Sequence, residues 1–277
     1  MKIFSCATIG VAVFAMPATA EQFNNSLELG FYSSSRQSSD SSGAADDGPF
    51  SGLYVAGQYA RTLGSGLELG VDLRYEALDE DAEDIDDYGR IDTGVLGLHL
   101  GTMTASGVYA GGFAGVGYFA AEDGDDTTTG YIVGGEIEKD LGGFAPFAQV
   151  AYVSAEPDPD DNAFVGMVYR VGASVEVTPA TNVMVSYEGG LSPDIFEDED
   201  ESGSFGIFSL SGSYSFTSNI DVVAAVSAET YTANTEDEAR EGNFYLGVRY
   251  NIGGGQPSAL TTPMGAFKAV DWASELD

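Results

Sequence analysis

Strict alternation of apolar and polar residues runs through Leu67-Glu68-Leu69-Gly70-Val71-Asp72-Leu73-Arg74-Tyr75, where every odd position is apolar and every even position is polar or glycine. A period of two is that of a β-strand with one apolar and one polar face. Similar alternation runs through 165–177, 183–187 and 244–252. Extended along the chain, the pattern predicts twelve strands, at about 26–32, 50–61, 67–77, 88–101, 107–121, 129–139, 144–155, 163–177, 182–191, 204–216, 220–232 and 243–252.

The links between these strands are of two kinds that alternate along the chain. Short turns lie at 63–66, 102–106, 140–143, 178–181 and 217–219, and longer links rich in Asp, Glu, Ser, Gly and Pro lie near 33–49, 78–87, 122–128, 156–162, 192–203 and 233–242. Transmembrane barrels have short periplasmic turns on one rim and longer outer loops on the other. The sequence therefore predicts an all-β fold, a single antiparallel up-and-down transmembrane β-barrel of about 12 strands with long acidic outer loops.

The first residues predict export. Residues 1–20 contain Lys2, an apolar stretch and the small-residue site Ala18-Thr19-Ala20, which together are typical of a cleaved signal peptide. The barrel is then expected over 21–252. Cys6 is the only cysteine and precedes the cleavage site, so neither a disulfide framework nor thiol chemistry is expected.

The residues after the last strand predict a flexible periplasmic tail over 253–277. They begin with Gly253-Gly254-Gly255, which is linker composition, and disorder is common at chain ends. Met264, Phe267 and Trp272 leave an alternative open, in which a short amphipathic turn plugs the mouth of the barrel or touches a partner.

The signal segment, the alternating strands and the asymmetry of the links resemble a Gram-negative outer-membrane β-barrel protein, and the Gly-rich, Asp-rich texture is similar to porins. In the last strand, Gly247, Tyr250 and Ile252 resemble the assembly signal of that family. The resemblance implies insertion in the cell outer membrane, with lipid and lipopolysaccharide as neighbours.

Aromatic residues lie near the long-link end of every predicted strand. Rings at headgroup depth form girdles around outer-membrane barrels. The pattern predicts such a girdle from Tyr32, Phe50, Tyr75, Tyr88, Tyr118, Tyr131, Tyr152, Phe164, Tyr187, Phe205, Tyr231 and Phe244.

The polar face of the strands is expected to line the lumen, because a charge facing hydrocarbon costs a few kcal/mol. The expected pore-lining residues are Glu28, Glu68, Asp72, Arg74, His99, Glu136, Arg170, Glu176, Glu188, Asp221 and Arg249. Barrel closure should bring Arg249 near Glu28, and a hairpin turning near 180 should pair Glu188 with Gly172. Inward-facing glycines at 134, 166, 172 and 247 favour an open, water-filled bore, and a charge network that fills the bore is the alternative.

The acidic excess is concentrated on the long links. The chain has 44 acidic and 10 basic residues, which excludes nucleic acid as a partner because phosphate binding needs Lys and Arg. A mouth surrounded by carboxylates attracts cations and repels anions, which predicts mild cation selectivity. The predicted acidic rim comprises Asp79, Glu80, Asp81, Asp84, Asp125, Asp158, Asp160, Glu197, Asp198, Glu199 and Asp200.

Together these features predict a passive, porin-like channel for small solutes or ions. The alternative is a closed structural or surface-interaction barrel with acidic outer loops. No enzyme activity is expected, since His99 is the only histidine. The sequence predicts no cofactor and no formed metal site, although the acidic links leave weak divalent cation binding open, and the oligomeric state is left open.

Overall fold

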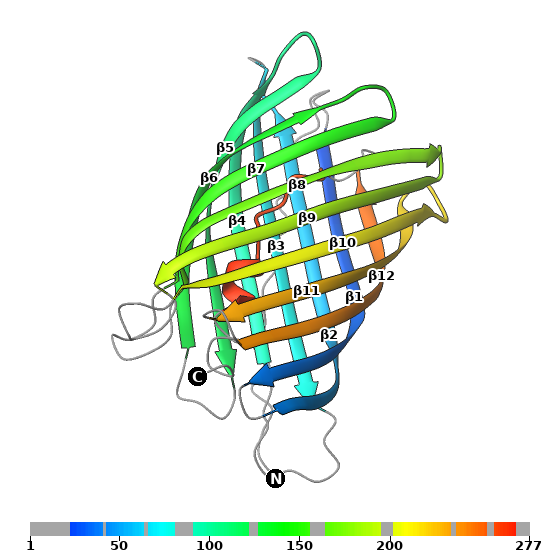
Figure 1. Ribbon diagram of the computed structural model, residues 1–277. Helices are drawn as coiled ribbons and strands as arrows, with labels where there is room; N and C mark the ends of the chain where they lie inside the picture. The colour runs from blue at the N-terminus through cyan, green and yellow to red at the C-terminus, as the bar shows by residue number, and fades with distance from the viewer. Residues whose placement is uncertain are drawn as a thin grey trace, which may run out of the picture.

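Twelve antiparallel strands close into one barrel, in which each strand pairs with its neighbours in the chain and β1 pairs with β12 (Figure 1). The computed structural model describes residues 23–40, 43–63, 66–80, 91–121, 127–155, 164–194, 202–233, 237–253 and 258–269. The predicted fold is confirmed. The strands are β1 Phe23–Asp40, β2 Gly43–Thr62, β3 Leu67–Glu80, β4 Ile91–Met103, β5 Val108–Ala121, β6 Thr127–Lys139, β7 Phe144–Ala155, β8 Phe164–Thr178, β9 Thr181–Asp194, β10 Gly203–Ser215, β11 Ile220–Ala233 and β12 Asp237–Ile252.

Two of the predicted long links are largely strand. β1 and β2 continue through 33–49 until Asp40 pairs with Gly43, and β12 begins at Asp237 within the predicted link 233–242. In both places the outward residues turn from apolar to polar, as in Phe31, Ser33 and Ser35 of β1. Alternation marks a strand only where one face meets hydrocarbon, so strands that continue into water lose that signal while keeping their ladder hydrogen bonds.

The outer surface of the barrel is apolar around its middle. Large aliphatic and aromatic side chains there are half exposed in the isolated chain, and the charged residues of the same strands point inward. This is the band expected to face lipid. It includes Leu29, Phe31, Leu53, Leu96, Leu98, Leu100, Val116, Val133, Ile137, Val150, Val171, Leu246 and Val248.

A charge placed in this band tests its contact with lipid. Leu98, in the middle of β4, is 52% exposed, and Leu98→Arg is expected to lower the free energy of unfolding in a bilayer by about 2–4 kcal/mol. Gln37→Arg is the matched control, since Gln37 is exposed beyond the apolar band of β1 and the change should cost little. Urea unfolding in lipid vesicles measures both, and equal losses would contradict the assignment.

The register confirms one predicted charge contact and corrects another. Glu28 of β1 pairs with Arg249 of β12 where the barrel closes, as expected. In the β8–β9 hairpin, however, Glu188 pairs with Arg170 itself and not with Gly172. An irregularity between Glu176 and Thr178 shifts the strand pairing. The expected pairing counted equal numbers of residues on each side of the turn, and such a count does not include an irregularity.

The predicted aromatic girdle is only partly present. Tyr131, Tyr152, Tyr187 and Phe244 are exposed on the outer surface. In contrast, a second set of the predicted rings points into the barrel, where they are almost fully buried: Tyr32, Phe50, Phe164, Phe205 and Tyr231. These inward rings belong to two apolar clusters that narrow the lumen toward the ends of the strands that carry the long links.

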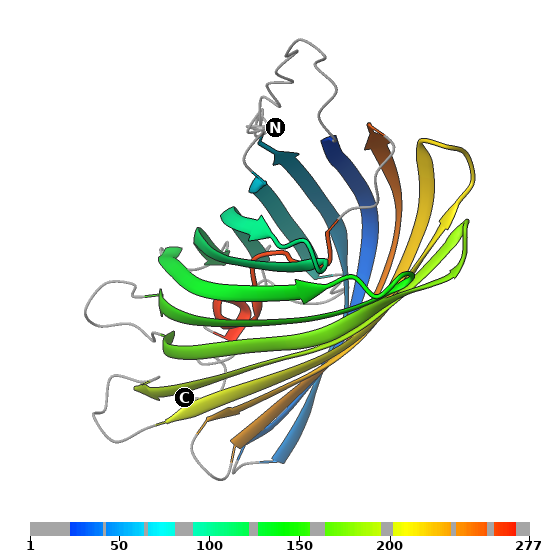
Figure 2. The ribbon, with the colours of Figure 1, turned by 90° about the horizontal axis from the view of Figure 1, so that it is seen from above.

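The chain after β12 turns back into the barrel. Residues 258–269, called here the lumen segment, run through the interior, and their last five residues form a short helix (Figures 1 and 2, red). Most of these residues are buried, which differs from the flexible tail that composition predicts. No helix in the described part of the chain is long and apolar enough to cross a bilayer.

Candidate functional site

The lumen segment is held by side chains from opposite walls of the barrel. At its start, Gln58 of β2 donates a hydrogen bond to the carbonyl of Ser258 (3.1 Å). Further in, Gln149 of β7 and Arg170 of β8 donate to Thr261, the latter to Oγ1 at 2.8 Å. The segment therefore enters at the rim that carries the short turns and satisfies its backbone on the charged inner face of the strands.

The only histidine lies beside the middle of the segment. His99 Nδ1 is 2.9 Å from both carboxylate oxygens of Glu136, and Nε2 contacts Asp72. Asp72 also accepts hydrogen bonds from the backbone N–H (3.2 Å) and hydroxyl (3.0 Å) of Thr262. Three strands are thereby joined to the segment through one buried polar cluster, and Phe113 stacks on the imidazole.

Two glycines in the wall allow the segment to approach closely. A Cβ at Gly97 would lie inside contact distance of the Thr262 side chain, and a Cβ at Gly117 would overlap the ring of Phe267. The glycines predicted to leave an open bore are instead covered: Gly134 by Phe113, Gly172 by Phe147 and Gly247 by Tyr54, while Gly166 meets the backbone at Leu191. Small residues here make room for side chains of the protein itself.

The short helix places one ammonium group among carboxylates and tyrosines. Lys268 Nζ is 3.0 Å from Glu76 Oε2, 3.6 Å from Glu229 Oε1 and 3.4 Å from the hydroxyl of Tyr245. The ammonium also lies 5.8 Å from the ring centre of Tyr32, which stacks on Tyr245. These four residues and the space between them are called the Lys268 site.

The carboxylates around Lys268 favour its charged form. Burial lowers the pKa of its ammonium group, but the carboxylates of Glu229 and Glu76 raise it by more, so that the pKa lies well above its ordinary value. The helix also presents the backbone N–H of Gly265 to Glu188 at 2.7 Å. The lumen segment therefore brings an ammonium group and a backbone hydrogen-bond donor to the acidic side chains of the barrel strands.

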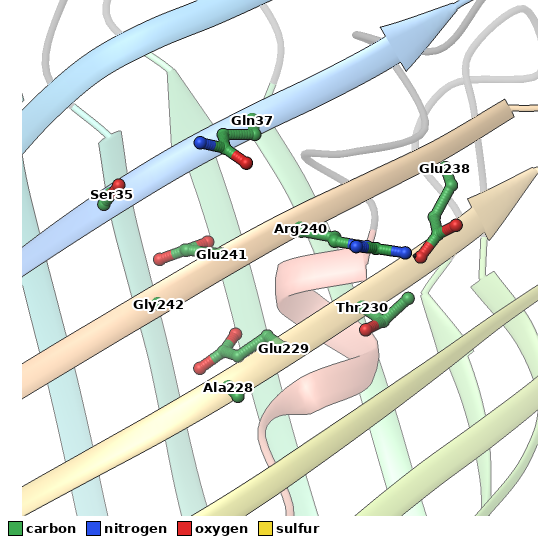
Figure 3. Close-up of a pocket in the computed structure, with 9 residues that line it drawn as sticks. All are labelled: Ser35, Gln37, Ala228, Glu229, Thr230, Glu238, Arg240, Glu241 and Gly242. Atoms are coloured by element: carbon green, nitrogen blue, oxygen red, sulfur yellow. Dashed lines mark hydrogen bonds and ion pairs between the residues drawn. The ribbon is translucent and has the colours of Figure 1, made fainter. Parts of the chain in front are cut away.

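Glu229 and Glu241 face each other across β11 and β12, with the short helix beside them (Figure 3). Like charges directly opposite in a ladder are destabilising unless cations lie between or beside them. Arg36 Nε is 3.5 Å from Glu241 Oε2, and Lys268 is the ion-pair partner of Glu229 among the described residues. Lys268 thus completes a charge balance that the strands leave open.

A cavity of about 850 Å³ lies alongside the lumen segment. Its lining extends from Asp140 and Glu176 near the short turns to Glu76 and Glu229 deep in the barrel, and it includes residues of the segment itself. Acidic side chains outnumber basic ones in this lining. The cavity is therefore bordered by more negative than positive side chains, and the lumen segment occupies part of the barrel interior beside it.

Most of the predicted lining residues border this cavity: Glu28, Glu68, Asp72, Arg74, His99, Glu136, Arg170, Glu176, Glu188 and Arg249. Asp221 is buried and accepts a hydrogen bond from Asn251, and the cavity lining does not include it. The side chains of the predicted acidic rim lie outside the described residues; Asp79 and Glu80 are described only as the backbone end of β3.

Sequence reasoning missed the residues that fix the lumen segment. Glu76 lies in the predicted strand 67–77 but is not among the expected pore-lining residues, and no role is predicted for Lys268. One signal was available, because Lys268 is the only basic residue after β12. Among the described residues, no group of three or more His, Cys, Asp or Glu side chains is arranged to hold a metal ion.

The fold is similar to solved outer-membrane channels. An outer membrane channel from Pseudomonas putida F1 superimposes with a TM-score of 0.59 at 10% identity, covering 85% of this chain and 97% of that chain. The TodX monoaromatic hydrocarbon channel, as a deltaS2 mutant, gives a TM-score of 0.51 at 9% identity, covering 86% and 91%. No family model and no curated protein sequence matches the chain.

The closed twelve-stranded barrel, its apolar outer band and these likenesses define an outer-membrane β-barrel with a channel-like, porin-like fold.

Proposed function

We propose that the protein is a passive outer-membrane channel for small solutes, with a preference for cations, and that the lumen segment closes it in the state described here. The observation that carries this proposal is the way the segment is held. It crosses a charged interior through hydrogen bonds and ion pairs to side chains, beside a cavity of about 850 Å³, and it forms no strand pairing with the wall. Contacts of this kind can be exchanged for water.

The acidic lining supports the preference for cations. Glu68, Glu138 and Glu176 border the cavity near the short turns, where a solute crossing the barrel would pass them. Rings of carboxylates raise the local concentration of cations and repel anions. The proposed orientation places the short turns in the periplasm and the acidic links outside, with an exported chain and lipopolysaccharide around the barrel.

Planar-bilayer currents under a KCl gradient test the proposal. A variant ending at Gly253 is expected to give steady currents whose reversal potential favours cations, whereas the full chain should be mostly closed. Replacing Glu68, Glu138 and Glu176 together by Gln in that variant should reduce the cation preference. A heat-modifiable gel shift verifies folding in each preparation.

Two outcomes would contradict the proposal. An anion-favouring reversal potential would refute the selectivity. Silence from a folded variant without the segment would refute the channel and favour the alternative, a closed structural or surface-interaction barrel. The buried apolar cluster around Phe267 is the observation that keeps this alternative in view.

A further inference from the structure

The Lys268 site is built as a receptor for an ammonium group. Two carboxylates from different strands, Glu76 and Glu229, lie 3.0 and 3.6 Å from the ammonium, and the side chains of Tyr32 and Tyr245 lie beside it. Charge-assisted hydrogen bonds and cation–π contacts are the interactions that bind alkylammonium ions in proteins. In this structure the occupant is a side chain of the protein itself.

We propose that the Lys268 site binds primary alkylammonium ions, such as aliphatic amines and diamines, in competition with Lys268. The inference rests on the proposed channel function and narrows its solute class. An entering ammonium ion replaces the contacts of Lys268 with Glu76 and Glu229, and the lumen segment loses the ion pairs that hold its helix. Solute binding and release of the segment are then coupled, because both ammonium groups need the same carboxylates.

Among the described residues, the strands of the barrel provide no positive charge that pairs with the Glu229 carboxylate. Its hydrogen bonds come from neutral groups, the hydroxyl of Tyr231 at 2.6 Å, the amide of Asn243 at 2.7 Å and the hydroxyl of Ser227 at 2.9 Å. Among the described residues, its ion-pair partner is Lys268. Glu76, in contrast, keeps Arg74 at 2.7 Å when Lys268 leaves. The vacated site would carry an uncompensated carboxylate that favours a new cation.

Glu229 also borders a second pocket. This pocket of about 430 Å³ lies at the outer ends of β1, β11 and β12, and its lining includes Glu229 and Glu241 (Figure 3). Glu229 also lines the larger cavity beside the segment. The carboxylate that needs a cation therefore stands between the lumen and the end of the barrel that carries the long links.

Cysteine labelling of the full chain measures release of the segment. Ala266 is 1% exposed in the segment, so in a Cys6→Ser, Ala266→Cys chain a water-soluble maleimide reacts only when the segment leaves the wall. The probe is n-butylammonium chloride, which is the lysine side chain without its backbone. At ten times its dissociation constant, it should raise the labelling rate about tenfold.

Two controls separate binding at the site from salt effects. KCl at the same ionic strength should raise the rate much less, because K⁺ lacks hydrogen-bond donors. In a Lys268→Met chain, which removes the competing ammonium from the segment and leaves the barrel wall unchanged, n-butylammonium should leave the rate unchanged. Equal acceleration by KCl, or equal acceleration in the Lys268→Met chain, would overturn the inference.

The assay does not depend on ion flow. If n-butylammonium accelerates labelling while the variant ending at Gly253 is silent in bilayers, the ammonium site stands and the channel proposal fails. If that variant conducts while n-butylammonium has no effect beyond KCl, the channel stands and the ammonium site is refuted.

Discussion

Phe267→Ala is expected to increase release of the lumen segment by about two to three and a half orders of magnitude. The Phe267 side chain is fully buried and packs in the apolar cluster that contains Phe164 and Phe205. Truncating a buried phenylalanine costs roughly 3–5 kcal/mol, and each 1.4 kcal/mol changes an equilibrium about tenfold. Because the cost falls on the docked state, the rate of maleimide labelling at Ala266→Cys measures it directly.

Phe216→Ala is the matched control for this variant. Phe216 is 74% exposed beyond the end of β10, so its truncation removes a phenyl ring without touching the segment. Its labelling rate should equal that of the parent chain. If Phe267→Ala also labelled at the parent rate, the apolar cluster would not hold the segment in place.

Arg249→Met is expected to lower the free energy of unfolding by about 3–5 kcal/mol. Arg249 Nη2 lies 2.7 Å from Glu28 Oε2 across the line where β12 meets β1, and the two side chains are 18% and 11% exposed. Removing one partner of a mostly buried ion pair leaves the other charge uncompensated. In this variant Glu28 keeps the hydrogen bond from the hydroxyl of Tyr54, at 2.7 Å. Urea unfolding in lipid vesicles measures the loss.

An exposed ion pair on β12, the strand that carries Arg249, provides the control for this prediction. Arg240 pairs with Glu238 at 2.7 Å, but the two side chains are 68% and 38% exposed, and ion pairs exposed to solvent contribute little to stability. Arg240→Met should therefore change the free energy of unfolding little. Similar losses in the two variants would mean that the Glu28–Arg249 pair does not stabilise the closure of the barrel.

Much of the fold could be predicted because lipid imposes a simple rule on the sequence. Leu67 to Tyr75 alternates strictly because a strand between lipid and a polar lumen needs one apolar and one polar face, and its charged residues do border the cavity. The rule ends where the strands leave the apolar band, so the sequence predicts links at the far ends of β1, β2 and β12, where the structure has strand. The pairing register near a turn is also not predictable from the sequence, because no particular residue type marks the irregularity after Glu176.

The site was predictable in part. The alternation of apolar and polar residues alone predicts that Glu28, Asp72 and Arg170 face the lumen, and all three border the cavity. The same phase would have placed some of the aromatic rings correctly, since Tyr32 is in step with Glu28 and Tyr231 with Glu229. The alternation of residues along the strands could not predict that the lumen segment packs against this inner face. The lumen segment has no strand pattern, and its position depends on contacts with residues far away in the sequence.

The Lys268 site draws its residues from both sides of the line where the barrel closes. Tyr32 belongs to β1 and Tyr245 to β12, while Glu76 and Glu229 come from β3 and β11. An open sheet with β1 and β12 apart lacks this site, so the full set of Lys268 contacts can form only after the first and last strands have met. The contacts of Lys268 therefore depend on closure of the ring, although Lys268 itself lies outside every strand.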